Sequence, residues 1–214
     1  MSIDMTDHQV WRLTETEAEE AGRLLSRVFI DEPIIVAALP DRTNRMRLCR
    51  PLFAANVRHA CRFGEVWGVG ATLGKPVGVA YWVPRPEPTL TAEVAEALGF
   101  TALQPEWEPV LARMRALEGE GIASLRHLPD PWRYLGAIGV EPDQRRQGLG
   151  GALLRRILVD AAAAGVTVGL VTDRAENRPF YQAGGFVQVA RATTADGTVP
   201  WWSLRTPHLQ HVVG

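Results

Sequence analysis

Residues 135–186 read LGAIGVEPDQRRQGLGGALLRRILVDAAAAGVTVGLVTDRAENRPFYQAGGF, and this stretch decides the fold of the chain. Its apolar beginning, residues 135–140, predicts a strand, and a polar loop then leads to two glycines at 148 and 150. Apolar residues at helical spacing follow them. Gly165 ends the predicted helix ahead of a Val-rich second strand over residues 166–172. The stretch therefore predicts a strand, a loop, a helix and a second strand in succession.

The glycines in front of the predicted helix indicate an anion site. Gly148 and Gly150 let a bound group approach the backbone, and the first turn of a helix leaves several amide N–H groups without internal partners. The helix dipole and the charges of Arg145 and Arg146 favour a negative ligand, such as a phosphate or pyrophosphate. A simple turn beside two solvated arginines gives the same short pattern, so the glycines alone leave both readings open.

Two other nucleotide-binding motifs fit this stretch less well. A P-loop needs Gly-Lys-Ser or Gly-Lys-Thr at the helix start, whereas Gly150 is followed here by Gly-Ala. A dinucleotide-binding fold needs three glycines directly after the strand, whereas residues 141–147 intervene and Leu153 stands at the third glycine position. Asp173 could imitate the ribose-binding acid of such a fold, which keeps this alternative open.

Further motifs surround the glycines, namely Val140-x-Pro142, Arg145-x-x-Gly148-x-Gly150, Asn177, Phe180-Tyr181 and Gly185-Phe186. Together they resemble the GCN5-related N-acetyltransferase (GNAT) family, in which the glycine loop holds the pyrophosphate of acetyl-CoA and the preceding strand lies along its pantetheine arm. The resemblance implies that acetyl-CoA is the co-substrate. It implies these acetyl-CoA-binding residues: Ile138, Gly139, Val140, Arg145, Arg146, Gln147, Gly148, Leu149, Gly150, Gly151, Asn177 and Phe180.

The same resemblance implies roles in the reaction. Tyr181 stands at the place of the family's tyrosine, which protonates the leaving thiolate, and its alternative role is core packing. Asn177 either binds pantetheine or caps the local chain, and Phe180 favours packing over ligand contact. A main-chain N–H of Gly139 or Val140 polarises the thioester carbonyl. Gly139 suits a β-bulge that frees such a donor, or it is simply a small residue that the strand requires.

A wider set of motifs carries a closer resemblance. They are Val28-Phe29 with Asp31 and Pro33, Pro40-Asp41-Arg42, Glu65-Val66-Trp67, Trp132, Asn177-x-Pro179-Phe180-Tyr181 and Trp202. These are similar to the puromycin N-acetyltransferase group of bacterial enzymes, from about residue 13 to residue 207. The likeness is strong in the acetyl-CoA half and looser elsewhere, so it supports the co-substrate better than the amine.

The resemblance does not supply the general base. Val171 stands where the puromycin group has a glutamate, and residues 132–140 contain no carboxylate or histidine. A base is useful because a primary amine with a pKa near 10.4 is mostly protonated at neutral pH. The remaining candidates are Asp31, Glu32, His127 and Asp173, and a water chain would make a single base unnecessary.

Composition limits the remaining possibilities. The 214 residues are 46% hydrophobic and contain no repeat, which predicts one globular domain over residues 1–214. A formal net charge of -1 argues against a nucleic-acid partner. Two cysteines, no signal peptide and no membrane-spanning run favour a cytoplasmic protein without membrane attachment. We expect no metal, and a monomer or a homodimer.

The rest of the chain completes the expected fold. Strands are predicted over residues 10–13, 65–72, 77–83, 186–190 and 199–204. The first helix is predicted to follow the capping-box pattern of Thr14 and Glu17 and to end at residue 29. Further helices are predicted over residues 34–39, 43–62, 91–98, 106–117 and 176–182. Pro51 predicts a kink or a restart in its helix. Residues 119–121 are expected to lead into the central strand. The result is an α/β fold of GNAT type, a mixed and mostly antiparallel sheet of about seven strands flanked by helices.

The expected activity is transfer of an acetyl group from acetyl-CoA to the primary amine of a small molecule, an antibiotic or a metabolite, by direct attack. Phe29, Trp82, Trp201 and Trp202 are expected to form an apolar slot for that amine, although core packing is the usual role of tryptophan. Two alternatives stay open. One is acetylation of a protein N-terminus or lysine, and the other is a weakly catalytic acyl-CoA-binding regulatory domain.

Overall fold

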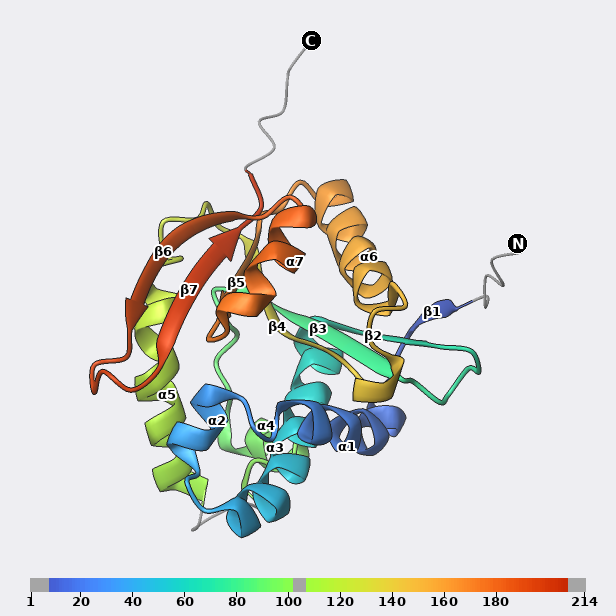
Figure 1. Cartoon of the computed structure of the whole chain (residues 1–214). Helices are drawn as coiled ribbons and strands as arrows, with labels where there is room; N and C mark the ends of the chain where they lie inside the picture. The colour runs from blue at the N-terminus through green and yellow to red at the C-terminus, as the bar shows by residue number, and fades with distance from the viewer. Residues whose placement is uncertain (1–7, 102–106, 208–214) are drawn as a thin grey trace.

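The computed structural model describes residues 8–101 and 107–207 (Figure 1). Its strands are β1 (Gln9–Arg12), β2 (Glu65–Gly70), β3 (Gly78–Arg85), β4 (Trp132–Val140), β5 (Val168–Thr172), β6 (Val187–Thr193) and β7 (Pro200–Arg205). Its α-helices are α1 (Ala18–Phe29), α2 (Pro33–Ala38), α3 (Arg42–Phe63), α4 (Ala92–Ala97), α5 (Trp107–Ala123), α6 (Leu149–Ala163) and α7 (Arg178–Ala183). Single 3-10 turns are η1 (Glu15–Glu17), η3 (Pro142–Gln144) and η4 (Ala175–Asn177).

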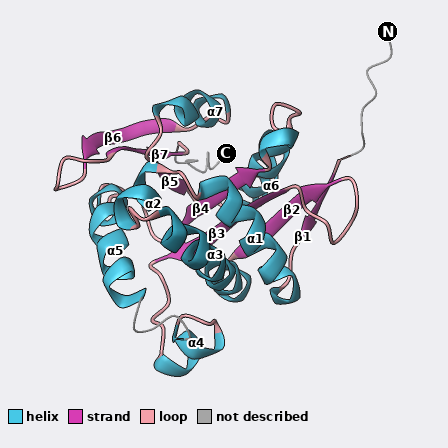
Figure 2. Cartoon of the chain, turned by 60° about the horizontal axis from the view of Figure 1, so that its bottom comes forward, coloured by secondary structure: helices cyan, strands magenta, loops and turns pink. Residues whose placement is uncertain are grey.

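The strands form one seven-stranded sheet in the order β1-β2-β3-β4-β5-β7-β6. All neighbours are antiparallel except β4 and β5, which are parallel and are joined through α6. Figure 2 shows β6 and β7 lying apart from β1, β2 and β3, with β5 between them. The predicted mixed and mostly antiparallel sheet of seven strands is confirmed.

Alternation along the central strands directs side chains to two separate cores. On β3, Tyr81 and Val83 join the core beneath α1 and α3, whereas Ala80 and Trp82 join the core beneath α6. Figure 1 shows α1, α2 and α3 below the centre of the sheet, and α6 with α7 above it. The strands of the predicted strand–loop–helix–strand unit therefore lie between two helical layers.

Local signals in the sequence explain where two long helices begin. The Thr14 amide donates to Glu17 Oε2 at 2.9 Å, as the capping-box pattern predicts, and α1 follows. Asp41 caps α3, because its Oδ1 accepts from the Asn44 amide at 2.8 Å. The restart that Pro51 suggested is absent, since α3 runs through this residue as one helix.

The largest departure from the predicted elements concerns α5. This helix continues through Gly119 and Gly121 to Ala123, beyond the predicted end near residue 117. Gly121 is needed there, because a Cβ atom would lie 2.8 Å from Cγ1 of Val171 on β5. Close packing against the sheet therefore overrides the helix-breaking tendency of two glycines.

A second glycine contact brings α1 against α3. A Cβ atom on Gly22 would lie 2.5 Å from the backbone nitrogen of Ala54. We expect Gly22→Val to lower the free energy of unfolding by about 3 kcal/mol, because backbone cannot yield as a flexible side chain can. Urea denaturation measures this change.

The matched control for that variant is Gly119→Ala. A Cβ atom at Gly119 meets nothing within 4 Å, so the change should stabilise α5 by up to about 1 kcal/mol. An unchanged urea midpoint for Gly22→Val would show that the α1–α3 contact is not as tight as described.

The helices within residues 8–101 and 107–207 are too short or too polar to cross a membrane. The same residues contain no group of three or more His, Cys, Asp and Glu side chains that could hold a metal ion. Cys49 and Cys61 are both free thiols. Burial raises the pKa of each to about 11, so both are uncharged at neutral pH.

Candidate active site

The parallel pair β4 and β5 separates soon after it begins. Arg133 faces Val168 and Tyr134 faces Gly169, and no further residues of the two strands are in register. The opposite edges are occupied, that of β4 by β3 and that of β5 by β7. The rest of β4, up to Val140, therefore presents backbone groups on an edge without a strand partner, where an elongated polar ligand can bind.

The loop after β4 forms an open cradle at the start of α6. Gly148 caps the helix with φ at 81°, and Arg146 also has a positive φ, 63°. The first helical amide bond in this turn runs from Ala152 to Gly148 O at 2.9 Å, so the amides of residues 149–151 lack the intrahelical partners of later turns. A Cβ atom at Gly148 or Gly151 would meet nothing within 4 Å. The cradle thus fits a phosphate group.

Other residues implied by the resemblance fix the position of this loop. Arg145 donates through Nε to Val140 O at 3.2 Å, which links the loop to the end of β4. A Cβ atom on Gly150 would lie 3.5 Å from Phe180 and 3.9 Å from Val140. Phe180 therefore lies beside the first turn of α6, with its ring partly exposed.

The bulge expected at Gly139 is wrong. Gly139 pairs in register with Val79, and the irregularity lies opposite Tyr81, where Gly136 is the extra residue of β4. Gly139 instead makes room for α1, since a Cβ atom there would lie 3.0 Å from Val28 Cγ1. The alternative reading, that the strand simply needs a small residue at 139, holds.

Tyr181 is the buried residue of α7, with 8% of its surface exposed. Its ring lies between Phe180 and Phe186, with centroids 5.1 and 5.9 Å away. Burial raises the pKa of the Tyr181 phenol, and the charges of Glu32 and Asp173 raise it further. The hydroxyl therefore stays protonated at neutral pH and can donate a proton.

Glu32 and Asp173 form a carboxyl pair in which each group affects the pKa of the other. Asp173 follows β5 and accepts from the Ile34 amide at 2.7 Å, and Glu32, just before α2, accepts from Arg174 Nε at 2.8 Å. Burial raises the pKa of both carboxyls, and the Asp173 charge raises the pKa of Glu32 further. Because the Ile34 amide stabilises the Asp173 anion, Glu32 is the carboxyl of the pair that takes up a proton first as the pH falls.

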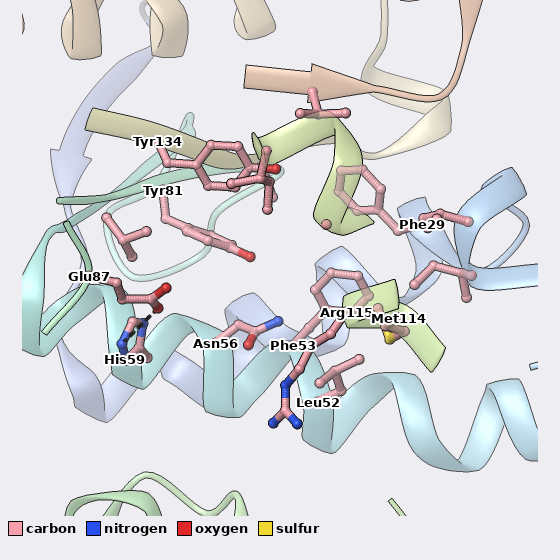
Figure 3. Close-up of a pocket in the computed structure, with 18 of the residues that line it drawn as sticks. Phe29, Leu52, Phe53, Asn56, His59, Tyr81, Glu87, Met114, Arg115 and Tyr134 are labelled. Atoms are coloured by element: carbon pink, nitrogen blue, oxygen red, sulfur yellow. Dashed lines mark ion pairs between the residues drawn. The ribbon is translucent and has the colours of Figure 1, made fainter. Parts of the chain in front are cut away.

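The carboxyl pair lies at one end of a cavity of about 850 Å³. Figure 3 shows its two sides: Phe53 and Asn56 project from α3 toward Tyr81 and Tyr134 of the sheet. The aromatic side chains that line the cavity are Phe29, Phe53, Tyr81, Phe100, Tyr134 and Trp201. The arrangement offers a cavity with aromatic walls that also contains two half-buried carboxyl groups.

Residues 91–188 match the acetyltransferase (GNAT) domain. Solved structures extend the likeness of fold to nearly the whole chain. A Corynebacterium glutamicum protein described as histone acetyltransferase and related acetyltransferase is 19% identical with a TM-score of 0.69, over 96% of this chain and 99% of that one. Arylalkylamine N-acetyltransferase 2 of Aedes aegypti is 13% identical, also with a TM-score of 0.69, over 95% and 100%.

A third similar structure is the Drosophila melanogaster polyamine N-acetyltransferase. It is 17% identical with a TM-score of 0.59, over 95% of this chain and 100% of that one. At these identities the likeness establishes the fold, and it agrees with the GNAT domain match. The described strands and helices thus have the GNAT arrangement, while the choice of acceptor depends on the cavity itself.

Two of the four aromatic residues that were expected to form the slot for the amine line the cavity. Phe29 and Trp201 line the cavity, but Trp82 and Trp202 belong to the core beneath α6. Strand alternation is the reason, because Trp82 points away from the cavity that its neighbour Tyr81 lines. Arg133 instead stacks on the Trp82 ring at 3.9 Å.

Of the candidate bases, the GNAT fold brings Glu32 and Asp173 together and separates the other two from them. Asp31 pairs outside the cavity with Arg42 and Arg45. His127 is exposed on the segment after α5 and does not line the cavity. Glu32 and Asp173 come from segments about 140 positions apart, which is why the sequence shows them only as separate candidates.

Asn177 and Val171 complete the surroundings of the site. Asn177 donates through Nδ2 to Thr172 Oγ1 at 3.3 Å, which links its side chain to the end of β5. Val171 lines the cavity against Gly121 of α5. A glutamate at position 171 would have to displace the contact with Gly121. The carboxyl groups of the site belong instead to Glu32 and Asp173.

Proposed function

We propose that this protein is an acetyl-CoA-dependent N-acetyltransferase that acetylates the primary amine of a small molecule, with residues 1–214 forming one GNAT-type domain. The observation that carries the proposal is that Glu32 and Asp173, from the start of α2 and the end of β5, together line a cavity of small-molecule size. Tyr181 lies in the core beneath α6 rather than in the cavity lining, and the charges of both carboxyls raise the pKa of its phenol. A protonated phenol and a carboxyl with a raised pKa are the two proton-transfer groups that acyl transfer to an amine requires.

The glycine cradle and the free edge of β4 support the choice of co-substrate. We assign the pyrophosphate of acetyl-CoA to the amides of residues 148–151, with Arg145, Arg146 and Gln147 beside them on an exposed loop. The pantetheine arm would lie along residues 138–140, where β5 has separated from β4, with Asn177 and Phe180 on its other side. Bound acetyl-CoA would supply the acetyl group as a thioester.

In this proposal the carboxyl pair of Glu32 and Asp173 removes protons from the amine, and Tyr181 protonates the leaving sulfur. The ionised carboxyl pair attracts the ammonium form of the acceptor and takes a proton from it. A C–N bond then forms as the C–S bond breaks, the nitrogen loses its second proton to the pair or to water, and Tyr181 donates its proton to the leaving sulfur. Solvent restores the Tyr181 proton, and the net reaction releases one proton.

The cavity favours a small amine over a protein. Its lining includes six aromatic residues, and its volume of about 850 Å³ is of the size that holds a small organic molecule. The structural relatives include proteins named for arylalkylamines, agmatine and polyamines. The motifs similar to puromycin N-acetyltransferases favour an antibiotic or metabolite amine, so puromycin belongs among the first substrates to try.

Incubation of the protein with radiolabelled acetyl-CoA and a cell extract tests the acceptor class. We expect the label in a small-molecule product that passes a filtration membrane and is distinct from acetyl-CoA itself. Label retained on protein would favour the N-terminal or lysine alternative. Label left on acetyl-CoA alone, with the extract replaced by an amine panel, would favour the regulatory alternative.

The cradle itself is tested by Gly151→Ala. The added methyl meets no protein atom within 4 Å, and alanine favours the helix, so thermal stability should stay equal or rise. The methyl would occupy space next to the bound pyrophosphate, and we expect the Kd for CoA to rise about tenfold by calorimetry. Gly119→Ala on α5 is the matched control, and an unchanged Kd for Gly151→Ala would place the pyrophosphate elsewhere.

A further inference from the structure

The end of the cavity away from the carboxyl pair contains polar groups that the acetyl transfer does not use. His59 and Asn56 lie on the same face of α3 as Leu52 and Phe53, which line the apolar part. Phe53 stacks on Phe29 with ring centroids 5.5 Å apart, and Phe29 lies shortly before Glu32 in the chain. His59 lies about 9 Å along the helix from Phe53, and Figure 3 shows His59 and Phe29 on opposite sides of the cavity.

His59 is buried without a hydrogen bond. It is 6% exposed, and its Nε2 atom has no hydrogen-bond partner within the described residues, although Glu87 Oε1 lies 3.4 Å away outside hydrogen-bond geometry. The ring is held by Phe63 and Phe100, with centroids 5.0 and 6.4 Å away. Because a buried polar atom without a partner costs free energy, a ligand that supplies one is favoured.

Asn56 stands one helical turn before His59 and is also available. Figure 3 shows its amide projecting from α3 into the space below Tyr81, beside His59. Within the described residues its side chain has no hydrogen bond. A side-chain amide can both donate and accept, so it complements His59 toward the same ligand atom.

Two charged residues close to His59, Arg85 and Glu87, pair with each other. The guanidinium carbon of Arg85 lies 5.1 Å from the centre of the Tyr134 ring. Burial lowers the pKa of His59 more than Glu87 raises it, so the imidazole is neutral at neutral pH. Asn56 and His59 therefore offer uncharged hydrogen-bonding groups to the cavity.

We propose that Asn56 and His59 form a specificity subsite that binds an uncharged polar group, such as a hydroxyl, at the far end of the acceptor. The acceptor is then an amine with an apolar or aromatic middle and a distal hydroxyl. Its amine binds at Glu32 and Asp173, and its middle packs between Phe53 and Tyr81. This inference rests on the proposed acetyltransferase function and adds the chemical class of the acceptor.

The test compares amines that differ only in a distal hydroxyl, tyramine against phenethylamine and 6-aminohexanol against hexylamine. CoA release gives kcat/KM for each. In the wild type we expect the hydroxylated member of at least one pair to be preferred by about tenfold or more. We expect Asn56→Leu, which keeps the shape of the side chain, to lower kcat/KM for the preferred hydroxylated amine about tenfold and to leave its apolar partner unchanged.

His59→Phe provides a second variant that keeps the ring packing with Phe63 and Phe100, and it should reduce the same preference. Asn44→Leu, at the exposed start of α3, is the matched control and should leave the preference intact. Acetylation of both members of each pair at equal rates would overturn the subsite alone. Absence of acetylation of every amine would overturn the proposed function, and the subsite with it.

Discussion

Tyr181→Phe is expected to lower kcat by about 100-fold or more while leaving the Kd for acetyl-CoA unchanged. The substitution removes one hydroxyl and keeps the ring that packs between Phe180 and Phe186. Loss of a positioned proton donor typically costs a factor of this size. Steady-state CoA release and calorimetric titration with acetyl-CoA measure the two quantities.

The pH dependence separates this role from simple packing. Because the pKa of Tyr181 is raised, its hydroxyl remains protonated through and beyond pH 10, and the wild-type rate should show no loss from Tyr181 ionisation below that pH. A packing role would instead lower the melting temperature of Tyr181→Phe and leave its kcat near that of the wild type. That result would remove Tyr181 from the reaction.

Glu32→Gln is the second variant with a large expected effect. Glutamine can still accept from Arg174 Nε, so the hydrogen bond that holds the Glu32 side chain is preserved. It cannot take up a proton from the amine. We expect kcat/KM at pH 7 to fall by about 100-fold or more, with thermal stability close to that of the wild type.

The acidic limb of the wild-type pH profile should carry the signature of the carboxyl pair. A raised pKa means that the pair holds its proton to higher pH, so kcat/KM should fall with decreasing pH at values above the ordinary glutamate pKa of about 4.3. In Glu32→Gln this limb should shift, since Asp173 then titrates alone beside an amide.

Asp31→Asn is the matched control for Glu32→Gln. Asp31 is the neighbouring carboxylate, but it pairs with Arg42 and Arg45 outside the cavity. Its amide variant should keep at least half of the wild-type kcat/KM. Equal losses in Asp31→Asn and Glu32→Gln would indicate a general electrostatic effect rather than a base at position 32.

The sequence predicts the elements around residues 135–186 because their signals are local. The apolar run of β4, the glycines before α6 and Gly165 after it each act on their near neighbours. The error at α5 has the opposite cause. Gly119 and Gly121 are poor helix residues alone, and only the contact of Gly121 with Val171 of β5 explains why the helix continues.

The candidate site divides in the same way. The cradle of residues 145–151 is visible as a motif, whereas the pairing of Glu32 with Asp173 depends on how the start of α2 meets the end of β5. The apolar residues of α3 predict the helix but do not indicate that Asn56 and His59 line a cavity. Two polar residues three positions apart on the face of Leu52 and Phe53 were the available signal.

CoA thiol release from acetyl-CoA tests the central claim most directly. The amine panel would contain puromycin, other aminonucleosides, aminoglycosides, polyamines, free amino acids, short peptides and arylalkylamines with and without a distal hydroxyl. We predict release above the no-amine background with one class of small amine, strongly reduced in Tyr181→Phe and Glu32→Gln. Protein that binds acetyl-CoA yet releases no CoA with any of these amines would contradict small-molecule N-acetylation.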